Sequence, residues 1–155
     1  MIHRGARNRL ACALRRYVSG RITNDDLDEV NVDSRDRGAV AVKQAAWTLY
    51  DDLHQHKATG KYRLGKKERR EVARWIIFLH SENDYYWPAY SFHQIFNWPL
   101  NLLTFGWWER RKNKKMESFA KAGSFRAWPF FTKEEFTRAR TCPKLFNAGR
   151  FRLDG

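Results

Sequence analysis

Cysteine is scarce in this sequence. Only Cys12 and Cys142 occur among its 155 residues, and two cysteines are too few for the disulfide framework of a small secreted domain. No histidine lies near either of them in the sequence. We therefore expect two reduced thiols and a cytoplasmic location.

Long apolar runs are also missing. No segment approaches the roughly 20 apolar residues that a membrane-spanning helix needs. The arginine-rich N-terminus has no continuous apolar stretch of the kind found in secretory signals. These absences predict a soluble, intracellular protein.

Patterns that carry chemistry are sparse. The glycines form neither a GxGxxG nor a GxxxxGK[ST] array, so the sequence gives no support for a nucleotide-binding loop. Ser81 and Ser91 lack the surroundings of an activated nucleophile. His54 and His56 are two residues apart, which places them on different faces of a helix. We therefore predict a protein that is not an enzyme and that has no catalytic residue, bound metal or cofactor.

One polar cluster leaves a chemical alternative open. His80, Glu82 and Asp84 follow one another at the end of a predicted helix, and these residue types can bind a cation or act as acid and base. The other interpretation, which we adopt, is a polar helix exit beside an aromatic core.

Acidic residues are outnumbered. The chain has 17 Asp and Glu against 30 Lys and Arg, for a formal net charge of +13. Such a charge favours an acidic partner, which can be nucleic acid, anionic lipid or an acidic protein. Residues 1–21 contain six arginines and no acid, whereas residues 22–56 contain eight acids and three bases. If the acidic segment packs on the basic helices, less positive surface is free than the net charge indicates.

Aromatic and aliphatic residues are plentiful by comparison. Aromatics make up 15% of the chain and hydrophobic residues 43%, enough for one domain with a sizeable core. We predict a mainly α fold, a single compact domain over residues 9–145 with mobile basic tails at 1–8 and 146–155. Its five or six helices are expected at 9–19, 23–30, 36–55, 66–80, 109–123 and 132–140.

The stretch from Lys66 to Pro88 organises this prediction. Val72, Trp75, Ile76 and Leu79 recur at i, i+3, i+4 and i+7, which places them on one helical face. We therefore expect Trp75 in the core. The buried stripe predicted for the preceding helix consists of Val42, Ala46, Leu49, Tyr50 and Leu53.

Capping patterns and proline positions refine the helix boundaries. Thr23 with Asp26, and Thr132 with Glu135, have the spacing of a capping box. Two Trp-Pro pairs interrupt residues 85–108, because proline disfavours the helical conformation in the residue before it. We expect an irregular aromatic segment there, with a short β-hairpin near Trp107 or at 125–128 as an alternative.

A dense basic run follows two adjacent tryptophans. Exposed indole rings beside cationic side chains can hold single-stranded nucleic acid by stacking and charge. The same arrangement suits an anchor in a membrane interface, or a solvated helix face beside buried rings. The predicted partner-binding residues are Trp107, Trp108, Arg110, Arg111, Lys112, Lys114 and Lys115.

Several motifs together resemble a family of short, uncharacterised bacterial proteins. They are RRYVSGRITNDDLDE, ERREVARWIIFLHSENDYYWP and GSFRAWPF, the last followed by a capped helix. The resemblance extends from about Leu10 to Leu145 and implies no activity and no site. The spacing of Tyr17, Gly20, Ile22 and Leu27 is also similar to the start of colicin-immunity-type helical proteins, which implies a helical inhibitor of a partner protein.

The sequence thus predicts a non-enzymatic binding protein whose basic, aromatic-flanked surface engages an acidic macromolecule, either nucleic acid or acidic protein. Two alternatives remain open. One is a peripheral membrane protein that binds through residues 96–115, and the other is an immunity-like inhibitor.

Overall fold

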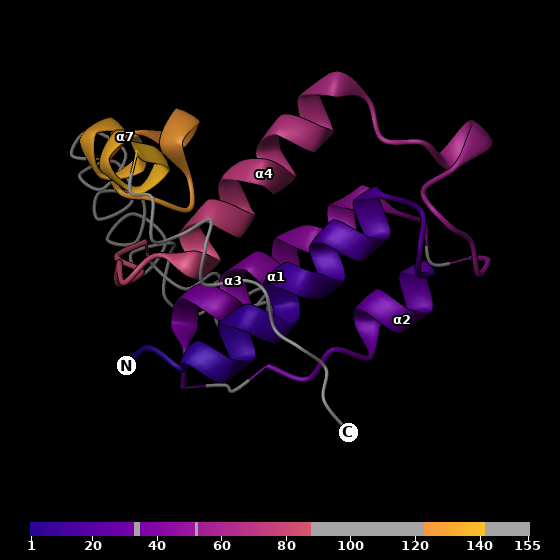
Figure 1. Cartoon of the computed structure of the whole chain (residues 1–155), viewed down its shortest axis with the longest axis horizontal. Helices are drawn as coiled ribbons and strands as arrows, with labels where there is room; N and C mark the ends of the chain where they lie inside the picture. The colour runs from indigo at the N-terminus through magenta and orange to yellow at the C-terminus, as the bar shows by residue number, and fades with distance from the viewer. Residues whose placement is uncertain (33–34, 52, 88–122, 142–155) are drawn as a thin grey trace, which may run out of the picture.

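The computed structural model describes residues 1–32, 35–51, 53–87 and 123–141 (Figure 1). These residues form five α-helices and short 3-10 turns, and contain an isolated bridge between Thr23 and Lys57 but no strand. The predicted mainly α fold is confirmed. The α-helices are α1 (Arg4–Val18), α2 (Asn24–Asp28), α3 (Arg37–Ala46), α4 (Lys66–His80) and α7 (Lys133–Thr141), and the 3-10 turns are η1 (Trp47–Leu49), η2 (Gly60–Tyr62) and η4 (Phe125–Ala127).

Helix α1 begins earlier than residue 9, where the sequence placed its start. The His3 ring caps it by accepting a hydrogen bond from the Ala6 amide, so residues 4–8 belong to the helix and not to the predicted mobile tail. The helix ends at Val18, one residue before the predicted end at 19, and is followed by Gly20, whose φ of 70° is a left-handed conformation that glycine adopts without strain.

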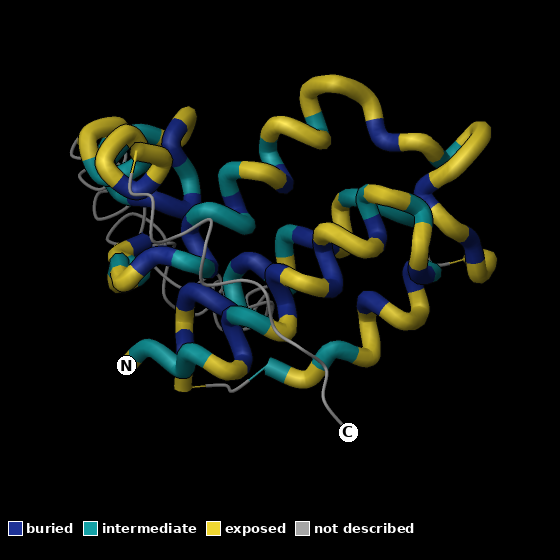
Figure 2. The backbone as a smooth tube through the Cα atoms, viewed as in Figure 1, coloured by how far each residue is buried: buried dark blue, intermediate teal, exposed yellow. Residues whose placement is uncertain are grey.

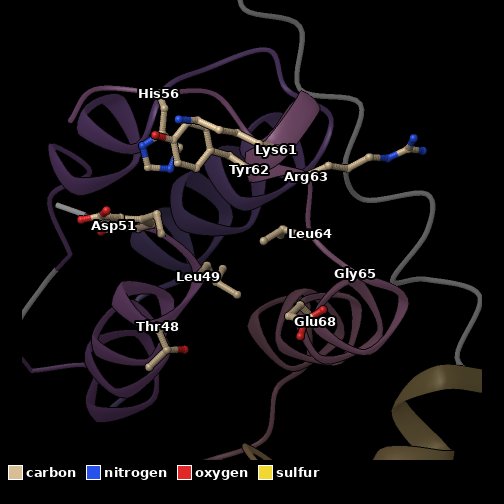
Figure 3. Close-up of a pocket in the computed structure, with 11 residues that line it drawn as sticks. Thr48, Leu49, Asp51, His56, Lys61, Tyr62, Arg63, Leu64, Gly65 and Glu68 are labelled. Atoms are coloured by element: carbon tan, nitrogen blue, oxygen red, sulfur yellow. The ribbon is translucent and has the colours of Figure 1, made fainter. Parts of the chain in front are cut away.

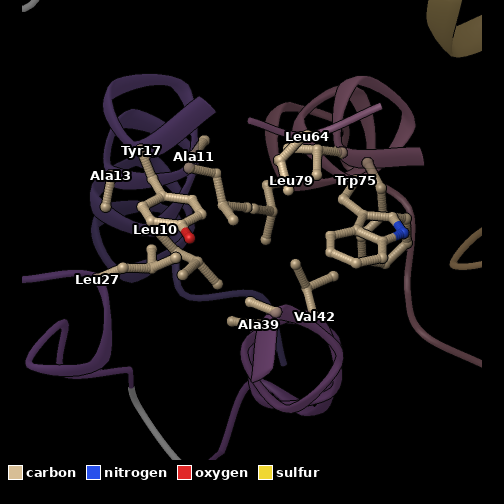
Figure 4. Close-up of a cluster of buried hydrophobic side chains, with 14 of the residues drawn as sticks. Leu10, Ala11, Ala13, Tyr17, Leu27, Ala39, Val42, Leu64, Trp75 and Leu79 are labelled. Carbon is tan, nitrogen blue, oxygen red and sulfur yellow. The ribbon is translucent and has the colours of Figure 1, made fainter. Parts of the chain in front are cut away.

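Helices α1 and α4 pack against each other in opposite directions, and α3 packs against both of them (Figure 1). Their buried residues lie where the three helices face one another (Figure 2). Leu10 and Tyr17 from α1, Leu79 from α4 and Val42 from α3 meet in this core (Figure 4).

Helix α4 has the bounds that the sequence predicted. Val72, Trp75 and Leu79 are buried and Ile76 is partly buried. The sequence stripe did not include Phe78, which is fully buried and stacks edge-to-face on Phe130 with ring centroids 5.3 Å apart. The buried face of α4 is therefore wider than one stripe, because the chain after η4 packs on it as well.

Helix α3 is much shorter than the predicted helix at 36–55. It ends at Ala46 and continues only through η1, and Leu53, predicted to be buried, is 80% exposed. The cause is the buried Asn24 side chain, which donates to the carbonyl oxygens of Asp51 and His54 and accepts from the His56 amide. These three bonds hold the chain after η1 against α2 in a non-helical path.

Both predicted capping boxes are present. Asp26 accepts from the backbone amide of Thr23 at 2.8 Å, while the Thr23 hydroxyl accepts from the Asp26 amide. Glu135 accepts from the Thr132 amide at 3.3 Å, and the Thr132 hydroxyl accepts from the Glu135 amide. Each pair satisfies amides that a helix start leaves without intrahelical partners.

The chain at 125–128 forms the 3-10 turn η4 and not the hairpin considered from the sequence. Trp128 is partly buried and meets the buried Trp75 edge-to-face, with ring centroids 5.6 Å apart. The other hairpin position, near Trp107, and the predicted helix at 109–123 lie outside the described residues, apart from Gly123. In the described part of the chain, every helix is too short or too polar to cross a membrane.

A buried ion pair joins α1 to α3. Arg7 and Asp36 are each 1% exposed, and the guanidinium binds the carboxylate through Nε to Oδ2 at 2.8 Å and through Nη2 to Oδ1 at 3.1 Å. Asp36 also caps α3 by accepting from the amides of Gly38 and Ala39. Arg7 Nη1 reaches the carbonyl oxygens of Ser81 and Asn83 beyond the end of α4. One pair thus connects three helices.

The carboxylate of Asp36 is held in its charged form. Burial raises its pKa, but hydrogen bonds from Arg7, the His3 amide and the Ala39 amide outweigh burial, so the pKa of Asp36 lies below its usual value. The ion pair therefore stabilises the folded state at neutral pH, and this contribution is lost as the pH falls below the ordinary carboxyl range.

Removing the Trp75 ring tests the core. Trp75 is 4% exposed, so Trp75→Ala should lower the free energy of unfolding by about 3–5 kcal/mol. Leu53→Ala, at an exposed position that the sequence also assigned to a buried stripe, should change it by less than about 0.5 kcal/mol. Urea unfolding followed by circular dichroism measures both values, and equal losses would contradict this core.

Breaking the ion pair tests the junction of the three helices. Arg7→Met leaves the Asp36 carboxylate buried without its partner and should cost about 3–5 kcal/mol in unfolding free energy. Arg9→Met, on the exposed face of the same helix, is the matched control and should cost less than about 0.5 kcal/mol. A loss of under about 1 kcal/mol for Arg7→Met would show that water reaches this carboxylate.

Candidate functional site

The partner-binding residues predicted from the sequence lie outside the described residues, so their role stays a prediction. They are Trp107, Trp108, Arg110, Arg111, Lys112, Lys114 and Lys115. The segment 96–115, proposed as a membrane contact, also lies outside. The candidate site of the described chain is found elsewhere, on the outer face of α1.

The helical repeat of α1 separates its apolar and basic residues. Leu10, Leu14 and Tyr17 face the core, as do Ala11 and Ala13, whereas Arg9, Cys12, Arg15 and Arg16 are exposed on the other side of the helix. Arg9 and Arg16 lie seven residues apart on this outer face and are exposed, and at 1.5 Å per residue their backbones are about 10 Å apart along the axis.

A hollow of about 640 Å³ lies between this face of α1 and the segment that contains α2. Its wall combines charged with small and aliphatic residues, and His80 from the end of α4 also contributes. We call it the arginine hollow, and its described lining residues are Gly5, Asn8, Arg9, Cys12, Ala13, Arg15, Arg16, Arg21, Ile22, Asp26, Val30 and His80.

The internal ion pairs explain why four arginines remain available here. Of the six arginines in residues 1–21, Arg7 is bound to Asp36 and Arg4 to Glu82. The four that line the hollow form no ion pair with another described residue; they are Arg9, Arg15, Arg16 and Arg21. The acidic segment thus neutralises only part of the basic N-terminal helix.

The single carboxylate among the described lining residues is already in use. Asp26 Oδ2 accepts from the Thr23 amide at 2.8 Å and from the Thr23 hydroxyl at 2.9 Å. These bonds, with smaller contributions from the charges of Arg16 and Lys57, keep the pKa of Asp26 below its usual value. Asp26 therefore keeps its negative charge, but four arginines outnumber it among the described lining residues, so the hollow has an excess of positive charge and suits an anionic ligand.

His80 is a neutral group at the edge of the hollow. Burial, followed by the charges of Arg15 and Arg4, lowers the pKa of His80 from 6.5 to about 4. Its Nε2 atom is buried without a hydrogen-bond partner among the described residues. At neutral pH the positive charge of the hollow therefore comes from guanidinium groups.

The three polar residues at the end of α4 do not share this hollow. Glu82 and Asp84 are exposed and are not among its lining residues, and Glu82 is paired with Arg4. No group of three or more His, Cys, Asp or Glu side chains in the described ranges is arranged to hold a metal ion.

A second hollow, of about 540 Å³, lies among η1, η2 and the start of α4 (Figure 3). The rings of His56 and Tyr62 stack with centroids 4.0 Å apart, and Lys61 Nζ lies 4.7 Å from the Tyr62 centroid. His56 Nδ1 lies 2.8 Å from the carbonyl oxygen of His54. The lining also contains two carboxylates, Asp51 and Glu68, beside its basic groups, so this hollow has less excess positive charge than the first.

The sequence carries a signal for the arginine hollow in the acid-free arginines of residues 1–21, to which no site was assigned above. Arg9 and Arg16 fall on a different face of the helical repeat from Leu10, Leu14 and Tyr17, which indicates an outward basic face. The concave shape had no such signal, because it depends on how α2 packs beside α1.

The titration of His80 tests the electrostatics of the hollow. We expect an NMR midpoint near pH 4, below the ordinary value of 6.5. Because the unfolded chain binds the proton more tightly, this group should reduce folding stability as the pH falls from about 6.5 to about 4. His80→Gln should remove that part of the pH dependence. In urea the wild-type midpoint should return to its ordinary range, and a folded-state midpoint above 6 would contradict the structure.

Comparisons of the chain with models of protein families, with curated proteins and with solved structures give no match. The resemblances drawn from the sequence therefore stay predictions, and the proposals below depend on the geometry and charge of the described residues.

Proposed function

We propose that this protein is a non-enzymatic nucleic-acid-binding protein that contacts backbone phosphates through the arginine hollow. The supporting observation is the set of four arginines that line one concavity, none of them in an ion pair with another described residue. Guanidinium groups bind phosphate oxygens in a bidentate manner and keep their charge at every physiological pH. Backbone phosphates provide most of the affinity in such complexes.

The make-up of the hollow favours nucleic acid over a membrane surface. Interfacial anchors insert large apolar or aromatic side chains beneath the lipid headgroups. The described lining residues include no phenylalanine, tyrosine or tryptophan, and the aliphatic ones, Ile22 and Val30, are buried and partly buried, so they do not project outward. A phosphate-rich strand needs only charge and shape complementarity.

The basic run at 110–115 and the tryptophans before it belong to the proposal as a further contact with the same strand. Stacking of bases on Trp107 and Trp108 would add affinity that does not depend on base sequence. A cytoplasmic location, expected from the two cysteines, is also part of the proposal. An acidic protein partner is the competing outcome of the experiment below.

Salt-dependent binding tests this function. Each phosphate contact contributes about 0.7 to the salt slope of single-strand binding and about 0.9 for duplex. Replacing the four arginines by glutamine should flatten the slope by about 3 for single strands and by 3 to 4 for duplex. The variant combines Arg9→Gln, Arg15→Gln, Arg16→Gln and Arg21→Gln.

A charge-matched variant is the control. It removes four exposed basic side chains at the start of α4, far along the chain from the hollow, and should keep a slope near that of wild type. The substitutions are Lys66→Gln, Lys67→Gln, Arg69→Gln and Arg70→Gln. Fluorescence anisotropy with labelled RNA and DNA at several salt concentrations gives the slopes. Equal flattening in both variants, or no binding by wild type, would contradict the proposal.

A further inference from the structure

The shape of the arginine hollow points to a more specific ligand than a strand passing over a basic surface. An internal phosphodiester can be bound on an exposed helix face without any concavity. A volume of about 640 Å³ instead falls within the range of about 300–1,000 Å³ that is typical of sites for small ligands. The arginines thus surround a space that can accept a projecting chemical group.

The wall of the hollow has an apolar part as well as a charged part. Ala13 and Ile22 are buried and Val30 is partly buried, and these side chains contribute to the lining beside the guanidinium groups. A nucleotide has a similar division, with the flat face of a base, which packs on apolar side chains, at one end and phosphate at the other. Charge and apolar surface are therefore both matched by a single nucleotide unit.

The amount of positive charge favours a terminal phosphate over an internal one. A phosphate monoester carries a charge of about −1.5 to −2 at neutral pH, whereas each internal phosphodiester carries one negative charge. The described lining residues include four arginines and one carboxylate, Asp26, which accepts hydrogen bonds from Thr23. The greater charge and additional oxygen of a monoester satisfy more of these donors than a diester does.

We propose that the arginine hollow binds the phosphorylated end of a nucleic-acid strand, with the terminal phosphate on the arginines and the terminal nucleoside against Ala13 and Ile22. This inference rests on the proposed nucleic-acid-binding function and specifies its ligand. The shared chemistry is a phosphate monoester on a terminal ribose or deoxyribose, and the experiment distinguishes its 5′ and 3′ forms.

The test compares short single strands of one sequence that carry a 5′-phosphate, a 3′-phosphate or no terminal phosphate. Charge-assisted hydrogen bonds to the additional phosphate should tighten binding of one phosphorylated form by about tenfold or more over the unphosphorylated strand. Inorganic phosphate at millimolar concentration should weaken that preference. Measurements at fixed ionic strength keep the general salt effect constant.

A variant that fills the hollow without changing its charge separates the effect of shape on binding from the effect of charge. Cys12 is exposed and lies on the wall of the hollow, so Cys12→Trp fills space there without changing the charge. Gln44→Trp, at an exposed position on α3, is the matched control. The terminal-phosphate preference should fall below about twofold in Cys12→Trp, by loss of the charge-assisted bonds, and should be unchanged in Gln44→Trp.

A measurement on the wild-type protein supports the same conclusion if the Cys12→Trp variant does not fold. Alkylation of Cys12, followed by peptide-resolved mass spectrometry, should slow when the preferred phosphorylated strand is bound. The unphosphorylated strand at equal concentration should protect Cys12 less.

The possible outcomes separate this inference from the proposed function. Equal binding of all three strands with a normal salt slope would overturn the terminal-phosphate inference and leave the proposed function standing. A preference that persists in Cys12→Trp, or that leaves Cys12 unprotected, would overturn the assignment to this hollow. Absence of binding to every strand would overturn both proposals.

Discussion

The buried ion pair between Arg7 and Asp36 is the constraint on which the arrangement of helices depends. A charged pair in the core is tolerated only when its donors and acceptors are nearly all satisfied. Here the carboxylate also accepts from the His3 amide and caps α3, while the guanidinium binds carbonyl oxygens beyond α4. Each of these bonds restricts the position of a different segment. The start of α1, the start of α3 and the exit of α4 are consequently held at one point.

This junction also determines which basic side chains face solvent. With Arg7 pointing inward, the 3.6-residue repeat directs Arg9 and Arg16 outward. Arg4 is used at the end of α4, where it donates to the carbonyl oxygens of Leu79 and Ser81. The first helix therefore divides its arginines between two tasks, since some join helices and the others surround the hollow. Net charge alone does not reveal this division.

Local sequence signals predicted the elements that depend on neighbouring residues, namely a helix with a strongly periodic apolar face and helix starts with a capping box. The bounds of α4 and both capping boxes are confirmed, and α1 ends one residue before its predicted end. The predicted helix at 36–55 was wrong after η1, because the hydrogen bonds of Asn24 come from a segment more than 20 residues away in the chain. The early start of α1 was missed for a similar reason. An arginine near the N-terminus is typical of a solvated tail, and only its distant partner Asp36 makes Arg7 a core residue.

The sequence by itself determined the helical class, the apolar face of α4 and the excess of basic residues, because periodicity, capping and charge are properties of neighbouring positions. Tertiary structure alone decided which cations are paired, where α3 ends, and that four arginines border a concavity beside α2. Those features arise from contacts between segments far apart in the chain. Such contacts are decisive because a buried polar group is costly unless it is hydrogen-bonded, and its partner can come from a distant segment of the chain.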